Sequence, residues 1–266
     1  MLCKMVTKEP DSSLENIIEL KNLRKVYRIG EEKVVALDNV SLDIKKGEFC
    51  CLLGTSGSGK STLLNLMAGL EKPTKGSIRI KGKAVEKMSE KQLAKFRQEH
   101  VGFVFQSYNL LPMLTALENV SMPLTFKGIS KSKRDKKAKE MLKAVGLSTH
   151  EQHKPSQMSG GQQQRVGIAR AFVGMPEIVF ADEPTGNLDS KTTREVMELI
   201  TKMARDNRQT LVIVTHDLEI ASYADRIVHI LDGNIEKIDI INNAGGVLNE
   251  EVDSSIHGVD AVPAGI

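Results

Sequence analysis

The chain has 266 residues, 40% hydrophobic and 27% charged, which is the composition of a globular protein with one large domain or a domain plus a subdomain. Its formal net charge of +3 is too small to indicate a nucleic-acid partner by itself. No stretch approaches about 18 consecutive apolar residues, and the start of the chain lacks the apolar core of a secretory signal, so we expect a cytosolic protein without a membrane span.

Short, almost continuously apolar runs recur along the chain, as is typical of strands covered on both faces in a parallel α/β sheet. They are Phe49–Leu53, Val101–Phe105, Ile178–Ala181, Leu211–Val214 and Ile227–Leu231. Helical spacing lies between them, in Leu63, Leu66, Met67 and Leu70 and again in Val196, Leu199, Ile200 and Met203. Strand and helix in alternation predict a mostly parallel sheet with helices on its faces.

The first run contains two of the three cysteines, Cys50 and Cys51; the other is Cys3. Their spacing does not suit a disulfide framework or a C-x-x-C redox or metal pair. We therefore expect Cys50 and Cys51 to be small buried side chains of a strand.

A glycine-rich segment follows this run and matches the pattern G-x-x-x-x-G-K-[ST] at every position. It reads Gly54-Thr55-Ser56-Gly57-Ser58-Gly59-Lys60-Ser61-Thr62. Glycines let the backbone curl so that its N–H groups face phosphate oxygens, and the following helix adds its positive end. Lys60 is expected to reach the β- and γ-phosphates, and the Ser61 hydroxyl to ligate Mg²⁺. The segment predicts ATP binding rather than a plain glycine-rich turn.

The stretch from about 107 to 157 is helix-prone and poor in strands, and Thr115-x-x-Glu118 predicts a capping box at the start of a short helix. Within it, Lys127 to Lys139 holds seven basic residues against one acid, Asp135. This basic run indicates either contact with anionic lipid or a partner, or a solvated helix face; the solvated face is the simpler interpretation.

Ser159-Gly160-Gly161-Gln162 also permits two interpretations. Ser-x-x-Gln is a capping box that would begin a helix ending near Phe172. Two glycines in the first turn, however, weaken a helix by about 1 kcal/mol each relative to alanine. Close approach of the backbone to an anion would compensate for that loss.

The run Ile178–Ala181 ends in two acids, Asp182 and Glu183. An acid at the carboxyl edge of a buried strand is poorly solvated, and open α/β sheets place ligands at this edge. Beside a phosphate-binding loop, Asp182 is the candidate Mg²⁺ partner, through water, and Glu183 the base that polarises the attacking water. The alternative is a pair of exposed loop acids.

Taken together, these segments resemble the ATP-binding cassette (ABC) ATPases over residues 17 to 240. The resemblance implies that Gln106, in VGFVFQSYNLLP, senses Mg²⁺ and the attacking water, and that His216, in VIVTHD, is the switch histidine. MSGGQQQR fills the signature, with Met158 where leucine is commonest. Gly186–Asp189 fills the D-loop, which would bring Asp189 near the nucleotide, and Tyr27, in KVYRIG, lies where relatives stack an aromatic ring on adenine.

Members of this family form head-to-tail dimers around two ATP molecules, so Ser159, Gly160, Gly161 and Gln162 would act on the nucleotide of a second copy. The implied fold is a P-loop NTPase of ABC type: a mostly parallel core sheet with a small N-terminal antiparallel β subdomain and a helical subdomain. We expect a flexible extension over 1–14, the ATPase domain over 15–240 with its helical subdomain at about 107–165, and a tail without regular structure over 241–266.

The segments GEEKVVALDNVSLDIKKGEF and ADEPTGNLDSKT look like the corresponding sequences of the macrolide-export and lipoprotein-releasing group. This likeness implies an integral membrane permease as partner, received by the surface at about Ser107 to Pro123, and a place on the cytoplasmic face of the membrane. One alternative is a regulatory ATPase that signals through a membrane partner without transport. The other is a soluble ATPase of nucleic-acid maintenance, but only 52 residues separate Gln106 from Ser159, without sustained heptads, so we expect no nucleic-acid partner.

Overall fold

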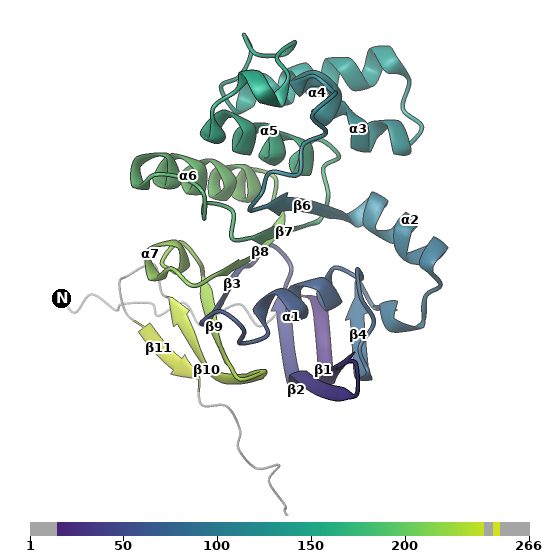
Figure 1. The fold of residues 1–266 in the computed structure, drawn as a ribbon, viewed down its shortest axis with the longest axis vertical. Helices are drawn as coiled ribbons and strands as arrows, with labels where there is room; N and C mark the ends of the chain where they lie inside the picture. The colour runs from purple at the N-terminus through teal and green to yellow at the C-terminus, as the bar shows by residue number, and fades with distance from the viewer. Residues whose placement is uncertain (1–14, 242–246, 251–266) are drawn as a thin grey trace, which may run out of the picture.

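The computed structural model describes residues 15–241 and, as backbone, 247–250. It contains two sheets and a group of helices that extends away from them (Figure 1). The expectations for residues 1–14 and for 242–246 and 251–266 lie outside the described residues.

The larger sheet has seven strands in the order β11-β10-β9-β3-β8-β7-β6. Pairing is parallel from β9 through β3, β8 and β7 to β6, and antiparallel where β9, β10 and β11 meet. The strands are β3 (Phe49–Leu53), β6 (Val101–Phe105), β7 (Ile178–Asp182), β8 (Thr210–Thr215), β9 (Arg226–Leu231), β10 (Asn234–Ile241) and β11 (Val247–Glu250). All five predicted apolar runs are therefore strands, and the parallel pairing predicted for them is confirmed.

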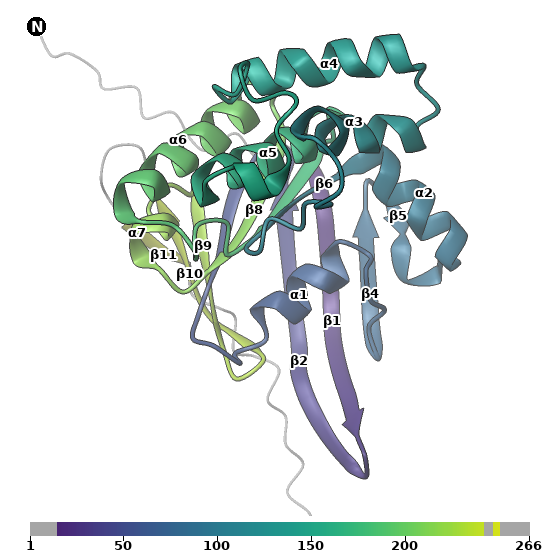
Figure 2. The ribbon, with the colours of Figure 1, turned by 45° about the horizontal axis from the view of Figure 1, so that its top comes forward.

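The smaller sheet is antiparallel, in the order β2-β1-β4-β5. It comprises β1 (Asn16–Ile29), β2 (Glu32–Lys45), β4 (Lys75–Ile80) and β5 (Lys83–Ala84). Buried residues of this sheet, such as Leu20, Leu37 and Ile44, share one hydrophobic core with α1 and one face of the larger sheet. Figure 2 shows α1 lying across β1 and β2. The fold expected from the family resemblance is confirmed.

The helices cover both faces of the seven-stranded sheet. They are α1 (Lys60–Met67), α2 (Glu90–His100), α3 (Ala116–Phe126), α4 (Lys131–Ala144), α5 (Gly160–Phe172), α6 (Ser190–Asp206) and α7 (Leu218–Ala221), with short 3₁₀ turns at Val85–Lys87 and Pro155–Gln157. Helices α3 to α7 pack with the opposite face of the sheet to form a second core. Among the described residues of 107–157 there is no strand, and α3 begins with the predicted capping box: Glu118 N donates to Thr115 Oγ1 at 3.2 Å.

The fold bears on three expectations about single segments. Helix α1 ends before Leu70, which is 45% exposed, because Gly69 takes a φ of +63° that a helix cannot continue through. Cys50 and Cys51 are fully buried in β3, and burial raises the pKa of both thiols, that of Cys51 to about 12. In the predicted structureless tail, Val247–Glu250 forms β11, which covers the otherwise open edge of β10.

Every helix in the described part of the chain is too short or too polar to span a bilayer.

Candidate functional site

The glycine-rich segment forms the turn between β3 and α1. This turn lies at the edge of the sheet where the parallel strands have their carboxyl ends. A side chain at Gly54 would put its Cβ 2.3 Å from the carbonyl oxygen of Ile230 on the neighbouring strand. Gly57 and Gly59 have φ values of +82° and +101°, which only glycine adopts readily. The loop therefore needs its glycines to curl and to start α1, whose first N–H groups are free for an anion.

Lys60 and Ser61, the first residues of α1, bring the loop into contact with the end of β7. Lys60 is 6% exposed and its Nζ donates to the carbonyl oxygen of Thr55 at 2.7 Å, so the ammonium lies inside the curl of the loop. Burial lowers the pKa of Lys60, while Glu183 and Asp182 oppose that shift. The Ser61 hydroxyl donates to Asp182 Oδ1 at 3.2 Å.

Asp182 carries a charge that the protein only partly compensates. Burial raises the pKa of its carboxyl, and nearby Glu183 adds to the rise, while Ser61 and Lys60 lower it. A cation bound here would complete the compensation. Ser61, Asp182 and the neighbouring Gln106 offer oxygen donors, the ligand type of Mg²⁺, which takes its remaining ligands from water and phosphate. The donor set fits that ion.

Glu183 and His216 form a pair at the ends of β7 and β8. His216 Nδ1 lies 2.9 Å from Glu183 Oε1. Glu183 has a φ of +45°, a strained value for a residue with a side chain, and its N–H is held by the carbonyl of Val214 at 3.0 Å. The backbone thus fixes the direction of a carboxylate whose partner orients it, which is the arrangement of a general base.

Gln106 follows β6 and contacts the D-loop. A Cβ at Gly186 would lie 2.7 Å from Gln106 Nε2, and Asn187 Nδ2 donates to the Gln106 carbonyl at 3.1 Å. Gln106 lies with predicted residues of the loop, Glu183 and His216 around one hollow of about 410 Å³. The hollow is lined by Val34, Val35, Ala36, Ser56, Gly57, Gly59, Lys60, Ser61, Thr62, Gln106, Glu183 and His216. Loop, base and switch residues, distant in sequence, therefore share one cavity.

The signature residues lie in a different hollow, of about 370 Å³, together with Asp189 and its neighbours Asn187 and Leu188. Ser159 caps α5, accepting from Gln162 N at 3.3 Å, while the Gln162 side chain accepts from Ser159 N at 2.9 Å. Asp189 caps α6 by accepting from the N–H groups of Lys191 and Thr192, and these bonds lower its pKa. Both segments thus have a structural role in capping, and neither lines the loop's hollow.

The two signature glycines also have a packing reason that the sequence alone did not suggest. A Cβ at Gly160 would lie 2.8 Å from the Tyr108 hydroxyl, and one at Gly161 would lie 2.8 Å from Thr192 Cγ2. Both atoms belong to side chains, so a larger residue at either position would have to displace Tyr108 or Thr192. The start of α5 itself lines the second hollow.

Tyr27 does not line the loop's hollow. Its hydroxyl donates to Glu71 Oε2 at 2.7 Å, and Lys25 Nζ lies 4.9 Å from its ring centre. Val34, which pairs with Tyr27 across the β1–β2 ladder, and Val35 do line it, and they are 43% and 44% exposed. Adenine stacking on Tyr27 stays a prediction. The sequence did not predict these valines as site residues, because the residues around them in β2 form no motif. They line the hollow only because β2 packs beside the phosphate-binding loop.

Two further residues were missed because their contacts are long-range. Asn119, fully buried on α3, accepts from Leu111 N at 2.8 Å and donates to the carbonyls of Leu111, Leu114 and Thr115. Arg170 on α5 donates to the carbonyls of Tyr108 and Asn109. Together they fix the segment that follows Gln106.

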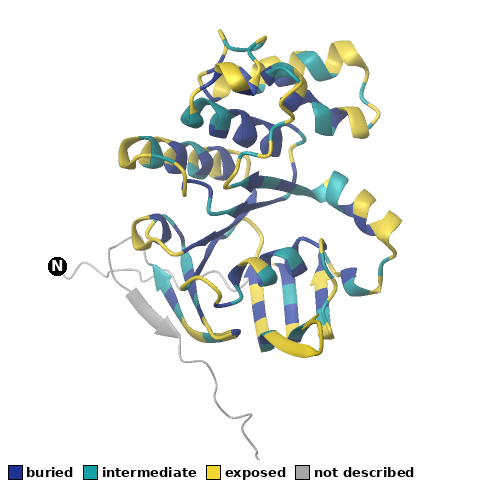
Figure 3. Ribbon diagram, viewed as in Figure 1, coloured by how far each residue is buried: buried dark blue, intermediate teal, exposed yellow. Residues whose placement is uncertain are grey.

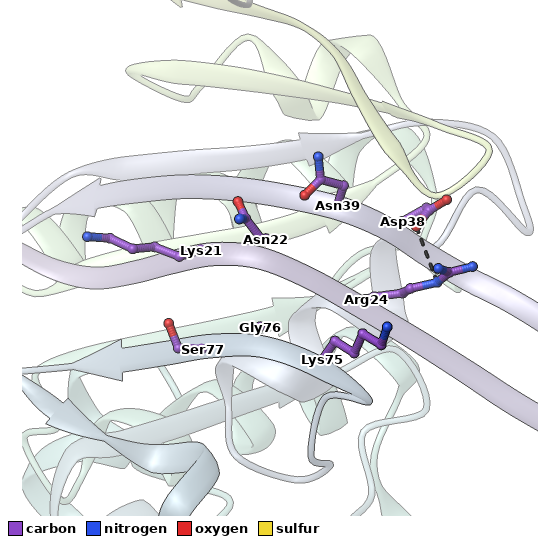
Figure 4. A pocket seen from close by; sticks show the side chains of 8 residues that line it. All are labelled: Lys21, Asn22, Arg24, Asp38, Asn39, Lys75, Gly76 and Ser77. Carbon is purple, nitrogen blue, oxygen red and sulfur yellow. Dashed lines mark ion pairs between the residues drawn. The ribbon is translucent and has the colours of Figure 1, made fainter. Parts of the chain in front are cut away.

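A hollow of about 580 Å³ lies on the antiparallel sheet, away from these residues. Figure 4 shows its lining, which includes Lys21, Lys75 and the ion pair of Arg24 with Asp38 at 3.3 Å. None of the predicted site residues lines it, so size alone does not identify the site.

Comparison with known proteins agrees with this geometry. Residues 37–186 match the family model described as "ABC transporter". The lipoprotein-releasing system ATP-binding protein LolD of Geobacter metallireducens is 47% identical over 222 residues, which cover 84% of this chain and 99% of that protein. The macrolide export ATP-binding/permease protein MacB of Syntrophobacter fumaroxidans is also 47% identical, over 83% of this chain but 31% of that protein.

A solved structure gives the same result for the fold. It is the dimeric post-hydrolysis state of the ATP-binding cassette MJ0796 of Methanocaldococcus jannaschii, bound to ADP and Pi. The TM-score is 0.80 at 46% identity, over 85% of this chain and 99% of that one.

Proposed function

The chain belongs to the ATP-binding subunits of ABC transporters, which hydrolyse ATP, and we propose that two copies close head to tail around two ATP molecules to drive a membrane permease. The observation that carries this proposal is the separation of two hollows on one chain. Lys60, Glu183 and His216 line one, and Ser159 to Gln162 line the other. A head-to-tail dimer, the arrangement implied by the family, would bring the first hollow of each copy against the second hollow of its partner.

Each residue has a part in hydrolysis on this proposal. The N–H groups of the loop and Lys60 bind the phosphates, and Ser61, Asp182 and Gln106 would hold Mg²⁺, which neutralises the charge that develops on the transferred phosphoryl group. Glu183, oriented by His216 at 2.9 Å, accepts a proton from the attacking water. Ser159 Oγ and the N–H groups at the start of α5 of the second copy contact the γ-phosphate.

We place the permease contact on the segment that follows Gln106. Leu111 and Met113 are 45% and 76% exposed there, and Asn119 and Arg170 hold the backbone that carries them. Exposed apolar side chains on a fixed backbone favour a protein partner. Because Gln106 is the residue before this segment, a displacement of Gln106 at the nucleotide site would also move the exposed side chains that contact the permease. LolD and MacB, by their names, serve lipoprotein release and macrolide export, and we propose a permease of that group and a place on the cytoplasmic face of the membrane.

The test uses Glu183→Gln, with Glu198→Gln on the exposed face of α6 as the control. Glu183→Gln should retain ATP binding, lose at least about a hundredfold in turnover because the base is gone, and accumulate as a dimer in size-exclusion chromatography with ATP. The control should behave as wild type. Wild-type turnover in Glu183→Gln would refute the role of the base. Absence of turnover stimulation by any reconstituted permease of the group would refute the transport part.

A further inference from the structure

Helix α4 presents an exposed basic surface that the ATPase site does not use. Lys131, Lys133, Lys136 and Lys137 are all exposed, and we call these four the basic face. Among the residues that the structure describes, none of the four has a carboxylate within 4.0 Å. Other charges on the helix are different: Arg134 lies 3.9 Å from Asp135, and Lys139 lies 3.3 Å from Glu151.

The placement of the basic face is unfavourable for the helix itself. The first turn of α4 contains no acid, so its lysines lie at the positive end of the helix dipole. Lys133 and Lys137 are spaced i, i+4 and repel each other. Two opposite-charge spacings of i, i+4 partly offset this repulsion, Lys131 with Asp135 and Lys136 with Glu140. The helix packs through Ala138 and Leu142, which are fully buried on the side opposite to Lys133, Lys136 and Lys137, so these three lysines add nothing to the packing. Lys131, in the first turn, contributes only a longer-range attraction to Glu118. The charge of the basic face is available to an anionic partner outside the chain.

An exposed phenylalanine ends the helix that precedes the basic face. Phe126, the last residue of α3, is 70% exposed and only the loop 127–130 separates it from α4. Figure 3 shows that the end of α3 and the start of α4 form one exposed corner of the helical region, and Figure 2 shows α4 along its outer edge. Lysines beside an exposed phenylalanine are the residue types that bind the interface of a bilayer, with cations among the headgroups and the ring at the acyl boundary.

We propose that the basic face and Phe126 bind directly to the surface of an anionic lipid bilayer. Lysine favours this partner over an acidic protein, because its ammonium is a mobile point charge, whereas specific ion pairs use the fixed fork of arginine. The face lines none of the hollows described above, so it offers no pocket for a single bound anion. The proposal goes beyond the proposed function, in which only the permease holds the chain at the membrane, and it can fail while that function stands.

The test is vesicle co-sedimentation of the full chain without permease or nucleotide. Vesicles of phosphatidylcholine alone are compared with vesicles that also contain phosphatidylglycerol. One variant carries Lys131→Gln, Lys133→Gln, Lys136→Gln and Lys137→Gln, and a second carries Phe126→Ala. The charge-matched control carries Lys21→Gln, Lys75→Gln, Lys83→Gln and Lys87→Gln, exposed positions in or near the antiparallel sheet. Circular dichroism and basal ATP turnover, expected to match wild type in all variants, show that each is folded.

Wild type and control should bind the anionic vesicles, and binding should fall as salt rises. A lysine near anionic headgroups strengthens binding about fivefold, so loss of four should weaken it at least tenfold even with incomplete contact. Phe126→Ala should weaken it about threefold or more. No binding of wild type to anionic vesicles at low salt would overturn the proposal and leave an acidic protein as the partner of the basic face. Equal losses in the α4 variant and the control, or equal binding to phosphatidylcholine alone, would also overturn it.

Discussion

Replacing Gly59 with alanine tests whether the phosphate-binding loop is held by close approach as well as by backbone conformation. The φ of +101° at Gly59 would cost a non-glycine residue about 1–3 kcal/mol of stability. In addition, the new Cβ would lie 2.5 Å from the carbonyl oxygen of Ala36 and 2.9 Å from Leu37 Cδ2. Because the first of these is a backbone atom of β2, it cannot turn away, and such overpacking costs about 1–3 kcal/mol more.

Gly57 provides the matched control in the same loop. Its φ is +82°, but a Cβ there would meet nothing within 4 Å. Gly57→Ala should therefore lose only the conformational part, about 1–3 kcal/mol, and Gly59→Ala about 2–6 kcal/mol in total. Urea unfolding followed by circular dichroism measures both free energies of unfolding. Equal losses in the two variants would refute the claim that β2 packs directly against the start of α1.

Two further substitutions test the segment after Gln106 that is proposed to contact the permease, and the proposed Mg²⁺ site. Asn119→Ala removes the side-chain partner of Leu111 N and of the Leu114 carbonyl, while the carbonyls of Leu111 and Thr115 keep backbone donors, and should lower the free energy of unfolding by about 1–3 kcal/mol. It should also reduce permease-stimulated turnover more than basal turnover; an equal reduction of both would contradict the coupling role. Because the folded state raises the pKa of Asp182, the contribution of this carboxyl to stability is greatest below the unfolded-state pKa of about 3.9 and is lost as pH rises through the folded-state value. Asp182→Asn without nucleotide should therefore raise Tm at neutral pH, by an amount that shrinks toward acid in thermal scans, and should abolish turnover. A lower Tm at neutral pH would show that Asp182 is already compensated.

The sequence predicts the core sheet well because burial leaves a local trace. Strands such as β3 and β8 are covered on both faces, so nearly every residue in them is apolar. Helix ends are less predictable. Leu70 continues the apolar spacing of α1, yet Gly69 ends the helix first, and the periodicity carries no sign of this.

In the candidate site, too, residues in local motifs could be predicted and residues defined by long-range contacts could not. Residues carried by contiguous motifs, such as Lys60 and Glu183, could be predicted because their chemistry requires a fixed local pattern. Asn119, Arg170, Val34 and Val35 could not, because their surroundings come from segments far away in the chain. The contact of Gly160 with Tyr108 shows the same limit: the two residues are 52 positions apart, so packing there could not be separated from anion binding in the sequence.

The central claim is that each ATP site is completed by a second copy of the chain. The most direct test is ATP turnover per chain as a function of protein concentration, with the oligomeric state measured in parallel by analytical ultracentrifugation. The account predicts turnover per chain that rises with concentration as dimer forms and falls toward zero where only monomer is present. Constant turnover per chain down to concentrations at which the protein is entirely monomeric would contradict it.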